Sequence, residues 1–160
     1  MLDKTDRQIV QLLQDDSNLS NAALSEKLGL KASTVYERVK KLEKRRVITG
    51  YIALVDPEAM GKPILAFVRL VIGSTTDFTK VKEDIAEVCS AEPDVLECHA
   101  LAGEDDYLLK VRAATTKDLE ALIARIRSNT NVLNTVTTIV LSSFKETQKL
   151  MPVTGLDLTK

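Results

Sequence analysis

Basic and hydroxyl side chains that gather in one short stretch have the clearest potential for chemistry. Between Lys27 and Gly50 there are eight basic residues against two acidic ones, so this segment has a net charge of +6 in a chain of net charge −1. Lysines bind phosphates through charge, and hydroxyl groups can hydrogen-bond phosphates and base edges. The pattern therefore fits a surface that binds a double-stranded nucleic acid.

A helix from about Ser33 to Arg46 would position these groups. Val35, Val39 and Leu42 recur at helical spacing and are expected to face inward. The other sides of this helix then supply the candidate DNA contacts, which are Ser33, Thr34, Tyr36, Glu37, Arg38, Lys40 and Lys41. A lysine-rich helix face taken alone is more often a solvated surface, so that alternative stays open.

Two further helices are predicted before it. Residues 3–15 place Ile9, Leu12 and Leu13 on one helical face, and a turn follows at 15–18. A second helix is expected to begin at Ser20, whose hydroxyl can cap it, and to end at Gly29. Three short helices within 50 residues predict a small bundle with a helix-turn-helix, a common frame for reading the major groove.

The second candidate site is a polar turn, Gly103-Glu-Asp-Asp106, between expected strands at 95–102 and 107–113. A glycine lets a bound molecule approach the backbone, and a carboxylate can accept hydrogen bonds from an amino group. The candidate effector-binding residues are Gly103, Asp105, Asp106, Tyr107 and Thr138. A solvated hairpin turn has the same composition, so this alternative also stays open.

Other residues do not suggest catalysis or metal binding. His99 is the single histidine, and with one neighbouring cysteine it forms no usual zinc site or catalytic set. Cys89 and Cys98 are interpreted as small buried hydrophobic residues. We therefore expect no enzyme, no metal and no cofactor.

The whole chain, 160 residues and 17.6 kDa, has the composition of a globular protein. Its longest apolar run, at 63–68, is too short to span a bilayer, and a charged N-terminus shows no secretory signal. With only two cysteines, the sequence favours a cytoplasmic protein without a membrane span.

The expected fold class is α+β, with a boundary where the periodicity changes. Residues 1–50 form the helix-turn-helix domain and 51–62 an extended strand and hinge linker, with the extension expected over 47–55. Residues 63–149 alternate as βαββαβ, a ferredoxin-like order, and 150–160 form a tail.

The expected elements of this second domain are a central strand at 64–72 covered on both sides, a helix containing Phe78 to Val88, the two hairpin strands, a helix capped at Thr115, and a last strand at 135–144. We expect another subunit to complete one sheet surface.

The motifs also resemble those of a known family. Ala23-Leu-Ser-Glu-Lys-Leu-Gly-Leu30, Ser33-Thr-Val-Tyr-Glu-Arg-Val-Lys-Lys-Leu-Glu43 and Gly103-Glu-Asp-Asp-Tyr-Leu-Leu-Lys-Val111 stand in the order and spacing of the Lrp/AsnC transcription regulators, a resemblance that runs from about residue 2 to 149. It implies a winged helix-turn-helix joined to a ferredoxin-like sensing domain. It further implies binding to double-stranded DNA and to a small-molecule effector, most often an amino acid, by homodimers that assemble into a higher oligomer such as an octamer.

Two residues depart from the family pattern. Lys31 stands where a capping serine is usual, and Arg46 stands where glycine is usual, so Arg46 is expected to be strained in a left-handed conformation or to add a phosphate contact. A metabolite-binding module without meaningful DNA affinity remains the alternative function.

Overall fold

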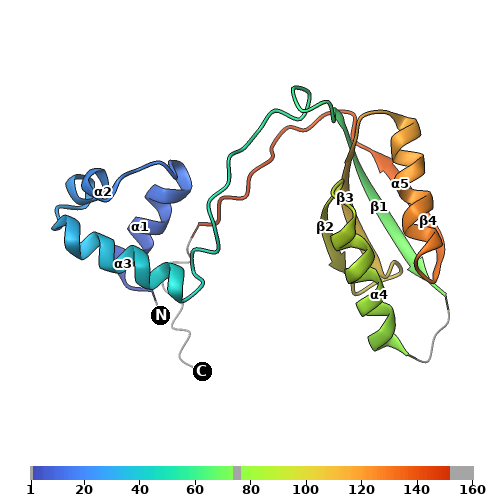
Figure 1. The fold of residues 1–160 in the computed structure, drawn as a ribbon, viewed down its shortest axis with the longest axis horizontal. Coiled ribbons are helices and arrows are strands. Elements are labelled where there is room, and N and C mark those ends of the chain that lie inside the picture. Colours follow the sequence, from blue (N-terminus) through green and yellow to red (C-terminus); the bar gives the residue numbers. More distant parts are fainter. Residues whose placement is uncertain (1, 74–76, 152–160) are drawn as a thin grey trace. The chain divides into compact units, whose positions relative to one another are not determined.

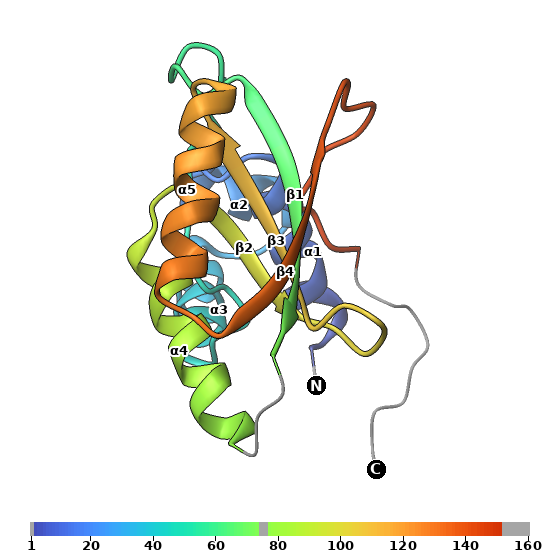
Figure 2. The ribbon, with the colours of Figure 1, turned by 90° about the vertical axis from the view of Figure 1, so that its right-hand side faces the viewer.

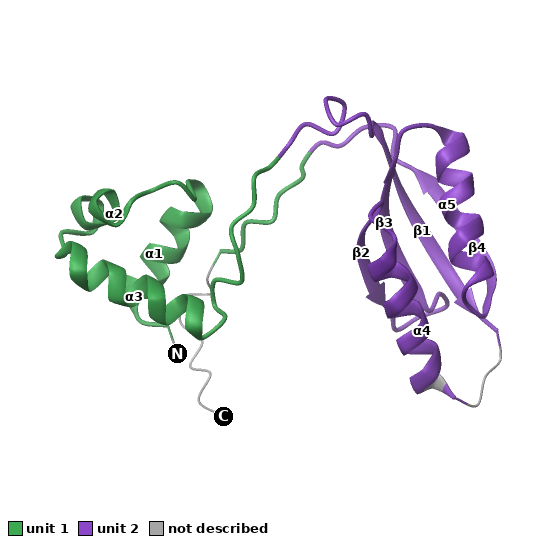
Figure 3. Ribbon diagram, viewed as in Figure 1, with its two compact units in different colours: residues 1–54, 145–160 green, residues 55–144 purple. Residues whose placement is uncertain are grey.

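The structure is a computed structural model that describes residues 2–73 and 77–151. It divides into two compact units (Figures 1 and 3). The first contains the described residues up to Leu54 together with the segment that begins at Lys145, and the second spans Val55–Phe144. Within the described ranges, none of the helices has the length and hydropathy of a membrane span.

The described part of unit 1 contains the helices α1 (Lys4–Asp15), α2 (Asn21–Leu28) and α3 (Ala32–Lys44). Its core is formed by Ile9, Leu13, Leu24, Val35 and Leu42. The predicted cap of α2 is confirmed, because the Ser20 hydroxyl accepts a hydrogen bond from the Ala23 N–H, and Gly29 ends the helix in a left-handed conformation. The three-helix bundle is therefore present, with α3 starting one residue before Ser33 and ending before Arg46.

The extension expected over residues 47–55, and with it a strand in the linker, does not form a strand in this structure. A strand needs a neighbour to pair its backbone N–H and C=O groups, and the ladders among the described residues involve only the four strands of unit 2. The strand part of the prediction was wrong, because β-branched composition reports a preference for extended backbone and not the presence of a pairing partner.

Unit 2 is a four-stranded antiparallel sheet with two helices on one of its faces (Figure 2). In chain order its elements are β1 (Ile64–Ile72), α4 (Phe78–Ala91), β2 (Val95–Ala100), β3 (Tyr107–Ala113), α5 (Thr116–Ser128) and β4 (Val132–Ile139). The strands lie in the order β2-β3-β1-β4. This confirms the βαββαβ prediction and places β1 at a central position.

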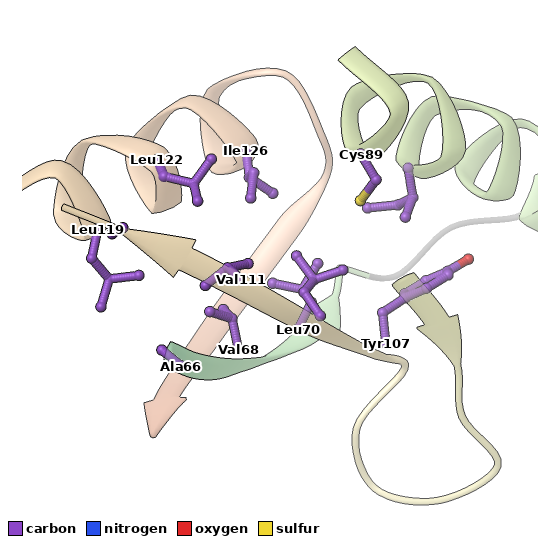
Figure 4. Packing of buried hydrophobic residues seen from close by; sticks show 12 residues of the cluster. Ala66, Val68, Leu70, Cys89, Tyr107, Val111, Leu119, Leu122 and Ile126 are labelled. Carbon is purple, nitrogen blue, oxygen red and sulfur yellow. The ribbon is translucent and has the colours of Figure 1, made fainter. Parts of the chain in front are cut away.

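The sheet buries only one face within this chain. Ala66, Val68 and Leu70 of β1 are fully buried against the helices, and Figure 4 shows them in the cluster with residues of β3, α4 and α5. The alternate residue Phe67 is half-buried and Arg69 is exposed. The expectation that this strand is covered on both sides is therefore wrong within unit 2, because α4 and α5 lie on the same face of the sheet (Figure 2).

Two strand ends also differ from the prediction. β2 ends at Ala100, because the Leu101 N–H donates to the Asp106 carbonyl and so begins the turn. β4 covers 132–139 instead of 135–144, since its pairing with β1 runs from Val132 to Ile139. Beyond this register the apolar side chains of Leu141 and Phe144 are 98% exposed, so hydrophobic composition alone overestimated the length of the strand.

Candidate DNA-binding face and effector loop

The outward side of α3 presents the polar groups that the sequence predicted. Val35 and Leu42 are buried, whereas the side chains around the rest of the helix are exposed, namely those of Ser33, Thr34, Tyr36, Glu37, Lys40 and Lys41. Part of this face is a shallow depression of about 780 Å³. It is lined by Asp3, Asp6, Thr34, Glu37, Arg38, Lys40, Lys41, Lys44 and Arg45.

Local contacts organise the middle of this face. The Lys40 ammonium lies 5.9 Å from the centroid of the Tyr36 ring and 3.4 Å from Glu43 Oε2. The Tyr51 hydroxyl donates to Glu43 Oε1 over 3.1 Å, and burial followed by the Glu43 contact raises the pKa of Tyr51. Within the described residues, Lys41 forms no ion pair, so its charge faces solvent.

Arg38, one of the predicted DNA contacts, forms ion pairs with two carboxylates of the protein itself. Its Nη1 lies 2.6 Å from Asp3 Oδ2 and 2.6 Å from Asp6 Oδ1. These hydrogen bonds raise the pKa of Arg38, and the Asp6 backbone N–H followed by Arg38 lowers the pKa of Asp3. Arg38 thus links α3 to the start of α1, a long-range pairing that the periodicity of α3 does not reveal.

Both ends of α3 carry the residues that depart from the family pattern, Lys31 and Arg46. Lys31 occupies the N-cap position and makes no side-chain capping bond. Arg46 follows the helix with a φ of 56°, the only positive φ of a non-glycine residue among the described residues. The expected left-handed backbone at Arg46 is confirmed, and its side chain remains exposed.

The polar turn after β2 is tied to the end of β1. The Asp106 N–H donates to the Leu70 carbonyl over 2.9 Å, and Asp106 Oδ2 accepts from the Ile72 N–H over 2.7 Å. Arg69 Nη1 also lies 3.1 Å from Asp105 Oδ2. One oxygen of the predicted amino-group acceptor, Asp106, is therefore engaged with backbone in this chain.

The five predicted effector residues do not all converge. Gly103, Asp105 and Asp106 share the turn, and a Cβ added at Gly103 would meet no atom within 4 Å. Tyr107 is paired with Leu70 and lies in the core on the helix side, where burial raises its pKa. Thr138 is paired with Phe67 and belongs to the opposite sheet face. The turn alone thus forms a local cluster.

The remaining reactive residues lie in β2 and α4. His99 Nε2 is 3.1 Å from Glu97 Oε2 on β2, and no group of three or more metal-ligating side chains occurs within residues 2–73 and 77–151. Cys89 is buried, as predicted, but Cys98 is exposed. The prediction failed for Cys98 because β2 is an edge strand, a position that the sequence did not reveal.

Comparison with known proteins matches each half of the chain to a known domain family. Residues 2–43 match the AsnC-type helix-turn-helix domain, and residues 65–150 match the Lrp/AsnC ligand binding domain. The chain belongs to the Lrp/AsnC family. As in that family, it joins a DNA-binding helix-turn-helix to a ligand-binding domain, which makes it a transcription regulator.

Individual Lrp/AsnC relatives are similar to this protein over nearly its whole length. The HTH-type transcriptional regulator LrpA of Mycobacterium tuberculosis is 36% identical, with 94% of this chain and 97% of the relative covered. A transcriptional regulator from Neisseria meningitidis, solved as its complex with L-Met, is 34% identical with a TM-score of 0.86, covering 94% of this chain and 96% of that one. The feast or famine regulatory protein of M. tuberculosis, complexed with L-methionine, is 34% identical with a TM-score of 0.85, covering 95% and 100%.

Proposed function

We propose that this regulator inserts α3 into the DNA major groove and that an amino acid, with L-methionine as the first candidate, controls its binding or assembly. The observation that carries the DNA part is the outward face of α3, where the hydroxyl groups of its first turns and the later lysines are exposed on a helix anchored by Val35 and Leu42. An α-helix fits the width of the major groove.

The two kinds of side chain would have different tasks. Ser33, Thr34 and Tyr36 lie near the start of α3, the part of a recognition helix that contacts base edges. Lys40 and Lys41 lie one to two turns further along, where a charge binds backbone phosphate without reading sequence. Arg38 would act indirectly, by fixing α3 against α1 through Asp3 and Asp6.

This division is tested by selecting preferred duplexes from a random pool with three proteins. Lys40→Ala combined with Lys41→Ala should weaken binding to every duplex alike and leave the preferred sequence unchanged, because phosphates are common to all sequences. Thr34→Ala should change the preferred bases. If both variants lose affinity uniformly, the assignment of base reading to the start of α3 fails.

The effector is proposed to bind at the turn that contains Gly103, Asp105 and Asp106. A free amino acid carries an ammonium group, which a carboxylate can accept as a charge-assisted hydrogen bond. The open space around Gly103 is available to a ligand or to another subunit, and the L-Met complexes of two relatives support the choice of ligand.

Calorimetric titration with L-methionine tests this assignment. The wild type should bind, and Asp105→Asn should weaken binding while the fold is retained, because the side chain of Asp105 is held by a single ion pair, with Arg69, among the described residues. Asp106→Ala should abolish the response, with circular dichroism as the control for folding because Asp106 also supports the Ile72 N–H. Undiminished affinity in both variants would refute the proposed site.

The sheet face opposite α4 and α5 supports a proposal about assembly. We propose a homodimer that covers this face and assembles further, with an octamer as the expected form. Phe67 of β1 and Val136 of β4 lie on this face, half-buried and exposed respectively, and burying such side chains favours association. Sedimentation of the full chain with and without L-methionine tests it, and a monomer at micromolar concentration would contradict it.

A further inference from the structure

Two cysteines from different elements line one surface pocket of the sensing domain. Cys89 lies in the last turn of α4, and Cys98 lies in β2 at the edge of the sheet. Both contribute to a pocket of about 360 Å³, which is also lined by Ala86, Ser90, Val95, Leu96 and Glu97. Of the two residues, Cys98 is exposed and can be reached by a small molecule, whereas Cys89 is buried.

The two thiols differ in a way that suits sequential chemistry. Cys98 pairs with Leu109 of β3, which belongs to the same buried cluster as Cys89. The interaction with Cys89 lowers the pKa of Cys98 to about 7, and the interaction with Cys98 together with burial raises the pKa of Cys89. Thiolates are the nucleophiles in disulfide exchange, and an attacking thiol works best when its pKa is close to the ambient pH. Cys98 is therefore the exposed nucleophile, and the protonated Cys89 lies behind it in the core.

We propose that Cys89 and Cys98 form a reversible disulfide by exchange with a low-molecular-weight disulfide. The Cys98 thiolate attacks one sulfur of that molecule, forms a mixed disulfide and expels the first small thiolate. Cys89 then loses its proton to solvent, attacks the Cys98 sulfur and expels the second small thiolate. The two cysteines are oxidised, the small disulfide is reduced to two thiols, and no other oxidant is required.

The new bond would join α4 to the edge strand β2. The sensing domain would then respond to low-molecular-weight disulfides as well as to its effector. It would lie next to the core position of Tyr107, because Ala100 pairs with Tyr107 and Cys98 pairs with Leu109 along β3. This inference rests on the cysteine pocket alone and does not depend on which amino acid binds the turn.

Reaction of the reduced full-length protein with glutathione disulfide, followed by N-ethylmaleimide and mass spectrometry, tests the proposal. The expected product has lost two hydrogen atoms, carries neither glutathione nor maleimide, and yields a linked Cys89–Cys98 peptide that dithiothreitol separates. The rate should rise with pH around a midpoint of about 7. A stable glutathione adduct on the wild type, or a rate midpoint near the ordinary thiol pKa of about 8.5, would overturn the proposal.

Two variants assign the roles of the sulfurs. Cys89→Ser should stop at a mixed disulfide on Cys98, and Cys98→Ser should react at least tenfold more slowly because Cys89 is buried. Equal rates for the two variants would contradict the order of attack. Because Cys89 lies in the core, circular dichroism checks each variant, and the wild-type product and pH profile decide the proposal if Cys89→Ser does not fold.

Discussion

Replacing Arg38 separates structural anchoring from DNA contact. Arg38→Met keeps much of the apolar stem but removes the guanidinium that bridges Asp3 and Asp6. Asp6 is only 8% exposed, so its carboxylate loses a charged hydrogen bond without gaining full solvation. A hydrogen bond to a charged group contributes about 1.5–3 kcal/mol. The more exposed Asp3 adds at most about 1 kcal/mol.

The expected destabilisation of unit 1 is therefore about 1.5–4 kcal/mol, the sum of these two contributions. Amide hydrogen exchange measures it locally: protected amides of α1 and α3 should exchange at least about tenfold faster, while those of α5 in unit 2 serve as the internal control. Asp6→Asn combined with Arg38→Met should cost less than the sum of the single changes. Additive losses would show that the pair does not couple α3 to α1.

The same variant should alter the acid response of unit 1. Because the folded-state pKa of Asp3 is lowered, its contribution to stability is fully present above the ordinary pKa and is lost as pH falls through the folded value. Arg38→Met should reduce this dependence without abolishing it, since the Asp6 N–H is the larger cause of the shift. If the loss of stability at low pH is the same in Arg38→Met and in the wild type, Arg38 does not contribute to the lowered pKa of Asp3.

DNA binding by Arg38→Met completes this test. The salt dependence of DNA affinity should keep its slope, because the lost charge is held by two carboxylates instead of a phosphate. A slope reduced by about 0.9 with stability intact would show that Arg38 leaves its partners and contacts DNA.

Two further predictions concern single positions. Arg46→Gly should stabilise unit 1 by about 0.5–1 kcal/mol in urea unfolding, because glycine removes the strain of the left-handed backbone, about 1–2 kcal/mol, and this gain exceeds the entropic cost of glycine. The control Arg46→Lys keeps the charge and should show no gain in stability. Equal stability of the two variants would refute the strain at Arg46. Thr115→Ala should cost about 1 kcal/mol, because the Thr115 hydroxyl caps α5 by accepting from the Asp118 N–H over 3.1 Å. Exchange protection in α5 measures this cost, and Thr115→Ser should restore the protection if the hydroxyl is responsible.

Local signals were predictable from the sequence. Ser20 and Gly29 mark the ends of α2, and Thr115 with Asp118 marks the start of α5, because capping involves residues close together in the chain. The apolar stretch Ile64–Ile72 likewise has its predicted bounds. Apart from the strand expected in the linker, periodicity was therefore sufficient to derive the order of elements and the outward face of α3.

Long-range pairing and solvent exposure were not predictable in the same way. The ion pairs of Arg38 join residues more than 30 positions apart, and the exposure of Cys98 depends on which strand becomes the sheet edge. Tyr107 and Thr138 fall on opposite faces because strand register, not proximity to the turn, decides where side chains point.

The central claim, that the exposed lysine-bearing side of α3 binds duplex DNA, is tested most directly by measuring affinity against salt concentration for the full-length protein. Log affinity should fall linearly with log salt, and Lys40→Ala combined with Lys41→Ala should make the slope shallower by about 1.8, or about 0.9 for each lost phosphate contact. Weak binding that does not change with salt, or a slope that the double variant leaves unaltered, would contradict the claim.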